Sequence, residues 1–388
     1  MVGAGPAGVA SALFLSQRGH DVLLLDKLVF PRDKLCGESV SPEAWRLLEA
    51  LDLADAVRRL APQPISGMAL FAPDGTRFNG RYPGERQGFA VRRLALDAAL
   101  LAVARERGIE VREGESVDDL VIEGGVTRGV RVRNSGGGRE IRSRLVVAAD
   151  GRHSTVARRL GLWRKHRSLH RFAVRGHWEG VHGLTDYGEM HVGRGAYCGV
   201  APLSAGTANI AFVVDRSEIA GAATDVTGFY RRTLRRWPEL CERLESATLV
   251  APPRAIGPLA VEPLHASAPG VALVGDAAGF YDPFTGEGIT LALRSAELLA
   301  PIAAAALRAG RSERLSEYEA ARDQATRAKF RLNRLLQRLI AWPQLADSVA
   351  RKLAHRPDLA DRLVGIAGDL VPAESALGPR FLWDLLTA

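Results

Sequence analysis

Apolar positions in the first 150 residues recur with a helical period in some segments and form short continuous runs in others. This pattern predicts, in chain order, a helix at Ala7–Arg18, a strand at Val22–Leu25, a helix at Arg93–Arg107, a strand at Glu110–Arg112 and a strand at Leu145–Ala149. The apolar runs have the composition of strands that are buried on both faces. Helices that alternate with such strands predict one parallel α/β sheet.

The pattern changes in the middle of the chain. From Phe172 to Asp215, polar and apolar residues alternate, which is typical of an antiparallel sheet with one covered face and predicts a second domain. The chain then returns to an apolar strand at Val271–Val274 and a helix from Ile289 to about Leu307. From Ser312 onward it is helical and rich in arginine, with breaks at Pro343, Pro357 and Pro372.

Composition excludes several function classes. The sequence has no run of about 18 apolar residues, and Cys36, Cys198 and Cys241 form no paired motif, so we expect a cytoplasmic protein without disulfides. The nine histidines are scattered without the spacing of metal ligands, so we expect no metal site.

The formal charge of +8 raises the question of a nucleic-acid partner. Only five of the 52 basic residues are lysines, and the arginines are dispersed along the whole chain rather than clustered, so we expect no nucleic-acid binding. The densest basic stretch, Arg322–Arg338, has helical spacing. A solvated helix face is the preferred interpretation, and peripheral contact with an anionic membrane is the alternative. The oligomeric state is left open.

A glycine motif stands at the beginning of the chain. Gly3-Ala4-Gly5-Pro6-Ala7-Gly8 fits G-x-G-x-x-G, whose glycines permit a tight turn and let backbone amides approach a pyrophosphate at a helix N-terminus. Asp26 ends the next strand eighteen residues after Gly8, where a carboxylate can accept hydrogen bonds from a ribose hydroxyl. A surface residue at a strand end is the alternative for Asp26. We predict a dinucleotide site here and include Lys27 in it.

Only Met1 and Val2 precede this motif, although a strand of several residues normally places such a loop. Either the natural start lies upstream, or the first strand is lost and the affinity for the dinucleotide with it. We expect the first.

Three further motifs resemble those of the para-hydroxybenzoate hydroxylase and geranylgeranyl reductase superfamily of flavoproteins. Arg93-x-x-Leu96-Asp97 is similar to the segment whose arginine reaches the flavin nucleotide, and Asp150-Gly151 resembles its DG fingerprint. Gly275-Asp276 followed by Pro283-x-x-Gly286-x-Gly288-Ile289 resembles its GD fingerprint, whose aspartate holds the ribityl chain and whose glycines open a helix toward the flavin. The resemblance covers about residues 1–310 and implies FAD as cofactor.

Electrostatics gives a second reason, independent of the resemblance, to place the Gly286-x-Gly288 segment beside a flavin. A reduced flavin carries negative charge near its pyrimidine ring, and a helix start with free N–H groups is a suitable partner for that charge. Ordinary turn residues are the alternative for Gly286 and Gly288.

The resemblance implies an α/β fold with a Rossmann-like FAD-binding domain assembled from residues 1–60, 88–160 and 255–310. A substrate domain with an antiparallel sheet, made of residues 61–87 and 161–254, is inserted into it, and a helical C-terminal region covers 311–388.

The loop from Phe30 to Glu38 occupies the place where the superfamily runs a segment alongside the flavin ring. Its Cys36-Gly37-Glu38 resembles the geranylgeranyl reductase subgroup, in which the cysteine lies against the ring, and Arg32 and Gly37 are predicted to bind cofactor. A small buried hydrophobic residue is the alternative for Cys36.

Two departures concern the substrate. Tyr197-Cys198-Gly199-Val200-Ala201-Pro202 keeps the tyrosine and proline of the prenyl reductases' Tyr-x-Trp-x-Phe-Pro strand, but Gly199 and Ala201 replace its large rings. This widens the predicted pocket and weakens the case for a prenyl chain, with Tyr197 as a pocket residue. The Trp-x-Trp-x-Ile-Pro motif of flavin-dependent halogenases is absent from the sequence, which disfavours halogenation.

These features predict an FAD-dependent oxidoreductase, with an NAD(P)H-dependent monooxygenase acting on an aromatic or polyketide-like molecule as the first hypothesis. A reductase of carbon–carbon double bonds in a lipophilic substrate, indicated by Cys36-Gly37-Glu38, is the second, and a truncated flavin-binding protein without activity is the third. The sequence has no second G-x-G-x-x-G unit, so we expect NAD(P)H, if used, to dock transiently on the FAD domain.

Overall fold

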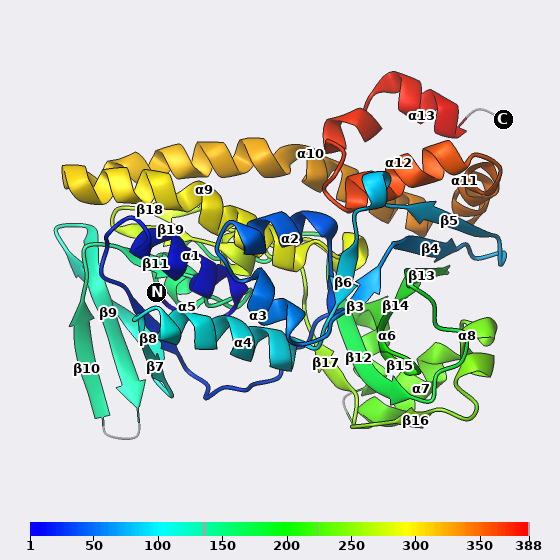
Figure 1. The fold of residues 1–388 in the computed structure, drawn as a ribbon, viewed down its shortest axis with the longest axis horizontal. Coiled ribbons are helices and arrows are strands. Elements are labelled where there is room, and N and C mark those ends of the chain that lie inside the picture. Colours follow the sequence, from blue (N-terminus) through cyan, green and yellow to red (C-terminus); the bar gives the residue numbers. More distant parts are fainter. Residues whose placement is uncertain (135–136, 223, 387–388) are drawn as a thin grey trace.

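The computed structural model describes residues 1–134, 137–222 and 224–386. Figure 1 shows an α/β half that contains the N-terminus and, beside it, a second half built on a twisted sheet. Two long helices, α9 (Gly288–Ala309) and α10 (Leu315–Ala341), run along the upper edge of this view, and α10 reaches from the first half to the second. The predicted α/β class with a helical C-terminal region is confirmed.

The α/β half is organised around a parallel sheet. Its strands are β1 (Leu23–Asp26), β7 (Glu110–Glu113), β11 (Val146–Ala148), β19 (Val271–Leu273) and, antiparallel at the edge, β18 (Ser267–Ala268). Val2 forms parallel bridges to both Leu25 and Ala148, so this one residue holds the central position of the sheet. A strand of several residues was expected before the glycine motif, and this short bridge stands in its place.

Helices cover the parallel sheet because apolar strands need cover on both faces. The helices of this half are α1 (Pro6–Ser16), α2 (Pro42–Glu49), α3 (Ala54–Arg58), α4 (Arg93–Glu106), α5 (Thr155–Arg159) and α9. A separate antiparallel sheet lies at its outer end, made of β8 (Ser116–Glu123), β9 (Val126–Asn134) and β10 (Gly137–Arg142). The largest apolar core of the protein joins α1, α4 and α9 to the parallel strands.

The second half is built on an eight-stranded sheet. Its strands run in the order β16 (Thr248–Leu249), β12 (Arg171–Glu179), β15 (Thr207–Asp215), β14 (Ala196–Ser204), β13 (Tyr187–Gly193), β4 (Gly67–Phe71) and β5 (Arg77–Arg81), with β17 (Arg254–Ile256) paired to β12. One face is covered by an apolar core that includes residues of α7 (Val226–Leu234) and α8 (Pro238–Arg243), while the short α6 (Arg216–Ile219) follows β15. The small sheet of β2 (Ser39–Val40), β6 (Gly88–Ala90) and β3 (Gln63–Ile65) lies between the two halves.

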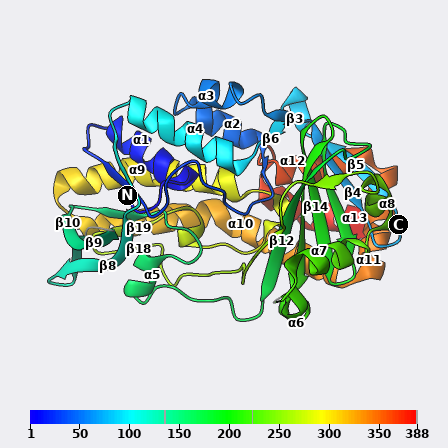
Figure 2. The same ribbon diagram turned by 90° about the horizontal axis from the view of Figure 1, so that it is seen from below.

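The C-terminal helices pack against the second sheet. They are α10, α11 (Pro343–His355), α12 (Pro357–Ala367) and α13 (Pro379–Leu386), and α11 and α12 contact β5. Figure 2, seen from below, shows the same helices behind β4 and β5. The face of the large sheet that α7 and α8 do not cover is directed toward the α/β half and contacts α10.

Helix α9 is the one helix among the described residues that is long and apolar enough to cross a membrane. Of its most apolar window, 61% is buried within the fold, where α9 packs on α1, α2 and α10. Burial of this kind is also what a core helix of a globular domain shows.

Candidate active site

A cavity of about 290 Å³ extends between the two halves of the molecule. Its lining changes along its length, from glycine-rich turns of the α/β half, through one face of the large sheet, to the C-terminal helices. Representative lining residues, in that order, are Gly5, Gly151, Gly286, Tyr197, Ala211, Leu336, Val349 and Val364. The two ends therefore differ in chemistry.

At the first end, glycines close the turn that leads into α1. Gly3 has a φ of +97°, a conformation that strains other residues. A Cβ atom at Gly8 would lie 1.8 Å from the carbonyl oxygen of Gly3, so the helix and the turn can meet only when residue 8 is glycine. A Cβ atom at Gly5 would meet only Arg32 Nη2, at 3.6 Å. The cavity wall at this turn consists of Gly5, Pro6 and Ala7.

The carboxylate of Asp26 ties the end of β1 to this turn. Its Oδ2 atom accepts a hydrogen bond from the Ala4 amide, and its Oδ1 atom accepts one from the Leu28 amide, both at 2.9 Å. Arg32 Nη2 lies 3.7 Å from Asp26 Oδ2. Lys27 is exposed and does not line the cavity. The fold therefore does not bring this predicted residue to the cofactor end of the cavity.

The DG segment contributes to the same end. Asp150 Oδ2 accepts a hydrogen bond from the Thr155 amide at 2.7 Å, while its Oδ1 atom is buried without a hydrogen-bond partner among the described residues. Burial raises the pKa of Asp150. Gly151, with a φ of +81°, lines the cavity beside it. The unsatisfied oxygen is a polar atom for which the protein itself supplies no partner.

The GD segment faces the glycine turn from the other side. A Cβ atom at Gly275 would lie 2.9 Å from Ala7 Cβ, so this glycine allows the two motifs to touch. Asp276 lines the cavity, and Lys34 Nζ lies 3.5 Å from its Oδ2 atom. Four more predicted residues line this end, namely Pro283, Gly286, Gly288 and Ile289.

Arg152 is a buried cation in the cavity wall. Its residue is 8% exposed, and its Nη1 atom has no hydrogen-bond partner among the described residues. Burial lowers the pKa of Arg152, against the attraction of Asp276 and Cys36. Because a buried guanidinium is costly unless it is paired, this position is suited to an anionic group of a bound molecule.

Cys36 and Arg93 lie together on the cavity wall. The Cys36 Sγ atom accepts a hydrogen bond from the Glu38 amide at 3.3 Å. Arg93 Nε and Nη2 donate to Asp97, each at 2.8 Å. Burial alone would lower the pKa of Arg93, but the Asp97 carboxylate and the Cys36 thiol outweigh it and raise that pKa. Arg93 therefore stays charged beside the cavity.

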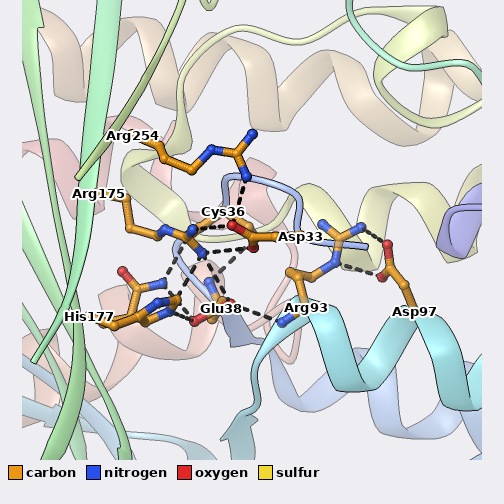
Figure 3. A network of polar contacts seen from close by, with 9 residues as sticks. Asp33, Cys36, Glu38, Arg93, Asp97, Arg175, His177 and Arg254 are labelled. Carbon is orange, nitrogen blue, oxygen red and sulfur yellow. Dashed lines mark hydrogen bonds and ion pairs between the residues drawn. The ribbon is translucent and has the colours of Figure 1, made fainter. Parts of the chain in front are cut away.

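Glu38 holds the Cys36 loop against the large sheet. Its Oε2 atom lies 2.7 Å from His177 Nε2 and accepts a hydrogen bond from Asn209 Nδ2 at 2.9 Å, and its Oε1 atom accepts one from the Arg93 amide at 2.9 Å. Arg175 Nη1 approaches the same Oε1 atom at 3.4 Å. Figure 3 shows Glu38 between these groups. We call Glu38, Arg175, His177 and Asn209 the Glu38 cluster.

The register of the sheet explains this cluster. Arg175 and His177 are two residues apart on β12 and point to the same face, and Asn209 on β15 is the direct cross-strand partner of His177. Asp33, in the same loop as Cys36, accepts hydrogen bonds from Arg175 at 2.6 Å and from Arg254 at 2.8 Å (Figure 3). The loop that carries Cys36 is thus fixed by charged contacts at two points.

Tyr197 lies on the cavity wall in the middle section. Its hydroxyl donates a hydrogen bond to Asp282, the residue directly before the Pro283–Gly288 turn, and its ring packs edge-on against Phe284 at 5.1 Å between centroids. Burial, together with Asp282, raises the pKa of Tyr197, and burial raises the pKa of Asp282. Gly199 and Ala201 also line the cavity, as the wider pocket predicted from them requires.

The far end of the cavity is apolar. Side chains from β4, β5 and helices α10, α11 and α12 line it, namely Met68, Leu70, Phe78, Leu332, Leu336, Leu339, Ile340, Val349, Ala350, Leu353, Leu363 and Val364. Glu189 is a carboxylate on the wall of the sheet, and Arg243 binds both of its oxygens, at 2.7 and 2.9 Å. A ligand bound at this end would therefore contact mainly apolar side chains.

The residues of the first end fit FAD. A turn without side chains at Gly5 leaves space for a pyrophosphate at the start of α1, and Arg152 and Lys34 supply positive charge. The start of α9 at Gly288 opens onto the same cavity, where it can face the negative pyrimidine ring of a reduced flavin. FAD would supply the redox chemistry here.

The roles of several residues in the site were not predicted from the sequence. Arg152 directly follows the Asp150-Gly151 motif, but only the fold shows that it is buried with an unpaired Nη1 atom among the described residues. Lys34 and Glu38 stood in the quoted loop, but their partners are distant in sequence. Asp282 precedes a quoted motif, and only the fold brings it to Tyr197.

Known proteins of similar sequence agree with this reading of the site. A family model described as "FAD binding domain" matches residues 1–332. A menaquinone reductase of Mycobacterium tuberculosis is 31% identical over 325 residues, which cover 78% of this chain and 75% of that protein. A digeranylgeranylglycerophospholipid reductase of Methanosarcina mazei is 28% identical over 322 residues, which cover 80% and 75%.

Solved structures share the fold. A flavoprotein/dehydrogenase from Cytophaga hutchinsonii superposes with a TM-score of 0.83 at 20% identity and covers 95% of this chain and 91% of that one. A triple mutant of the flavin-dependent brominase Bmp2 gives a TM-score of 0.84 at 20% identity, covering 96% and 95%. With the family match over most of the chain and a site that fits the cofactor, this chain belongs to the FAD-binding domain family and is an FAD-dependent oxidoreductase.

Proposed function

We propose that the protein reduces a carbon–carbon double bond in an isoprenoid lipid, the second of the two enzymatic hypotheses. The observation that carries this proposal is the apolar far end of the cavity, which suits a long hydrocarbon chain and offers an aromatic or polyketide-like molecule few polar partners. The names of the two relatives, a quinone reductase and a geranylgeranyl phospholipid reductase, support a lipid substrate.

The shape of the middle section agrees with this assignment. The small residues Gly199, Ala201 and Ala211 lie on one face of the sheet and line the cavity there. A Cβ atom at Gly199 would still find Met190 Cε at 3.7 Å, so the flexible Met190 side chain borders the space that Gly199 leaves. These small side chains leave room for a lipid chain in the middle of the cavity. The space at Gly199 and Ala201 does not by itself require an aromatic substrate.

Reduction of a double bond needs a hydride and a proton. FAD, when bound and reduced, supplies the hydride. Tyr197 carries a proton on the cavity wall and shares it with Asp282, whose pKa is raised by burial. We assign the proton donation to the Tyr197 hydroxyl, which would exchange its hydrogen bond to Asp282 for one to the substrate, while the Glu38 cluster fixes the loop of Cys36 at the cavity wall.

The test uses the reconstituted holoenzyme, reduced without oxygen and mixed with an unsaturated polyprenyl quinone or a geranylgeranyl lipid. We expect the flavin to be reoxidised and the isoprenoid chain to gain two hydrogen atoms, located by fragmentation in mass spectrometry after any quinol has been reoxidised in air. Tyr197→Phe should slow the reaction at least about tenfold without loss of bound flavin. An unchanged lipid mass at full flavin loading would contradict the proposal.

A monooxygenase remains the second candidate because Gly199 and Ala201 open the middle of the cavity beside Tyr197. It requires an electron donor, for which we propose NAD(P)H docking transiently on the α/β half. Reduction by NAD(P)H followed by air, with an aromatic substrate present, should then yield a hydroxylated product. Hydroxylation with no lipid reduction would favour this candidate over the first.

A further inference from the structure

Helix α10 has two opposite faces of different character. Four of its side chains, Leu332, Leu336, Leu339 and Ile340, line the apolar end of the cavity. Four arginines at helical spacing, Arg327, Arg331, Arg334 and Arg338, are exposed to solvent. Residues three or four apart lie on the same side of a helix, so these arginines form one stripe. We call them the α10 arginines.

None of the α10 arginines forms an ion pair with a residue that the structure describes. The neighbouring charged side chains of α10 have other partners. Glu319 lies 2.9 Å from His265 Nδ1, and Lys329 pairs with Glu287 and Asp369. A solvated helix face of ordinary composition carries acidic residues one turn from its basic ones. This stripe has positive charge in excess, with Asp323 as its nearest exposed acid on α10.

A second basic segment lies against the same helix. Arg334 Cζ is 5.9 Å from the centre of the Tyr281 ring, and the His166 ring is 5.4 Å from that of Tyr281. Burial lowers the pKa of His166. Glu262 opposes this shift, whereas the nearby Arg334, His170 and Arg164 add to it. His166 is flanked in sequence by Arg164, Lys165 and Arg167. Arg164 pairs with Glu262 at 3.7 Å, whereas Lys165 and Arg167 form no ion pair with a described residue and add positive charge beside the helix.

Apolar side chains are exposed at the end of the stripe. Trp342, directly after α10, is 69% exposed, and Leu335, between two of the arginines, is 37% exposed. An exposed tryptophan costs free energy in water, and it is favourable at the interface between lipid headgroups and hydrocarbon. Basic residues beside exposed apolar ones are the composition of helices that lie on anionic membranes.

We propose that the α10 arginines and Trp342 form a surface that binds an anionic lipid bilayer. The opposite face of the same helix lines the cavity, so binding would place the apolar end of the cavity about one helix diameter, roughly 10 Å, from the lipid. This inference goes beyond the proposed reaction. The test of membrane binding needs no substrate, so membrane binding and the proposed reaction can fail independently.

The test is sedimentation of the yellow holoprotein with vesicles of phosphatidylglycerol and phosphatidylcholine, compared with vesicles of phosphatidylcholine alone. We expect binding to the anionic vesicles that weakens with added salt. Each basic residue near such a surface contributes about fivefold in affinity. Replacing all four α10 arginines by Gln should therefore lower the affinity at least tenfold, and Trp342→Ser should lower it severalfold.

A matched control removes the same charge elsewhere. Arg59, Arg86, Arg194 and Arg235 are exposed on other elements, and their replacement by Gln should leave vesicle binding within about twofold. Absorbance of the flavin and circular dichroism confirm that both fourfold variants are folded. Equal loss in the two variants, equal binding to neutral vesicles, or no binding at low salt would overturn the proposal. Binding of duplex DNA that depends on the α10 arginines, without vesicle binding, would also overturn it.

Discussion

The two ends of the cavity are built in opposite ways. The cofactor end is formed by backbone, with glycines at fixed spacing and a few charged side chains, and a single Cβ atom at Gly8 would collide with Gly3. The apolar end, which we call the lipid end because we propose that a lipid binds there, is formed by apolar side chains of helices and strands without fixed spacing. Hydrophobic surfaces tolerate exchanges that conserve volume, whereas a turn closed by backbone contact does not. We therefore expect substitutions to act very differently at the two ends.

The strongest way to disturb both ends together is to remove the Glu38 carboxylate that joins the halves. Glu38→Ala leaves His177 and Asn209 buried without their carboxylate partner, while Arg175 keeps Asp33, so the free energy of unfolding should fall by about 1–3 kcal/mol. Denaturant unfolding measures this loss. Glu49→Ala, at an exposed ion pair with Arg58, is the control and should cost less than about 1 kcal/mol. Equal losses would show that the cluster does not stabilise the junction.

The cofactor end can be tested with two alanines in one motif. Gly8→Ala should lower the free energy of unfolding by roughly 1–3 kcal/mol, because its Cβ atom meets the Gly3 carbonyl. Gly5→Ala has room in the protein and should leave stability unchanged, while FAD affinity falls at least about tenfold because backbone must approach the pyrophosphate there. Flavin titration and thermal unfolding separate the two effects. Full FAD affinity in Gly5→Ala would argue against this placement of the pyrophosphate.

The lipid end should respond to bulk without affecting the cofactor. Leu336→Trp narrows the cavity and should lower turnover of a long isoprenoid about tenfold, while a short alkene and FAD binding are affected little. Leu335→Trp adds the same ring at the neighbouring, partly exposed position and serves as the control. Loss of activity on long and short substrates alike would contradict a role in accommodating chain length.

The smallest expected effect concerns Glu189, the carboxylate on the cavity wall. Burial raises its pKa, but hydrogen bonds from His191 and Arg243 outweigh burial and hold the pKa of Glu189 below its ordinary value of 4.5. A carboxyl group with a lowered pKa stabilises the folded state above its unfolded value, and this contribution is lost as pH falls through the folded value. Glu189→Gln should therefore lower the Tm near pH 7 more than near pH 3. An equal decrease at both pH values would contradict the assignment.

The sequence was most informative where chemistry depends on local spacing. The glycine turn, the DG and GD segments and the α/β class were all predictable, because each requires particular residues at fixed intervals in one stretch of chain. The structure brings Gly5, Gly151, Asp276 and Gly288 to one end of the cavity. How these residues contact FAD stays a prediction.

Features that depend on tertiary register were not predictable. The Glu38 cluster exists because His177 and Asn209 are cross-strand partners, and no local pattern states which strands pair. The helical spacing of the Arg322–Arg338 stretch was predicted, but a helical pattern does not say whether the apolar side of the helix contacts a core or a cavity. Val2 holds a central sheet position with two backbone bridges, although a propensity argument requires a longer strand there.

One consequence follows from where the two walls of the cavity come from in the chain. The cofactor end is drawn from three separated segments, whereas most of the lipid end comes from one continuous stretch, residues 332–367. A continuous stretch can be exchanged by a single recombination event that leaves the three cofactor segments untouched. Descendants of such a protein can therefore acquire new substrates of different chain length while inheriting the same redox machinery, and a designer can retarget the enzyme by grafting this one segment.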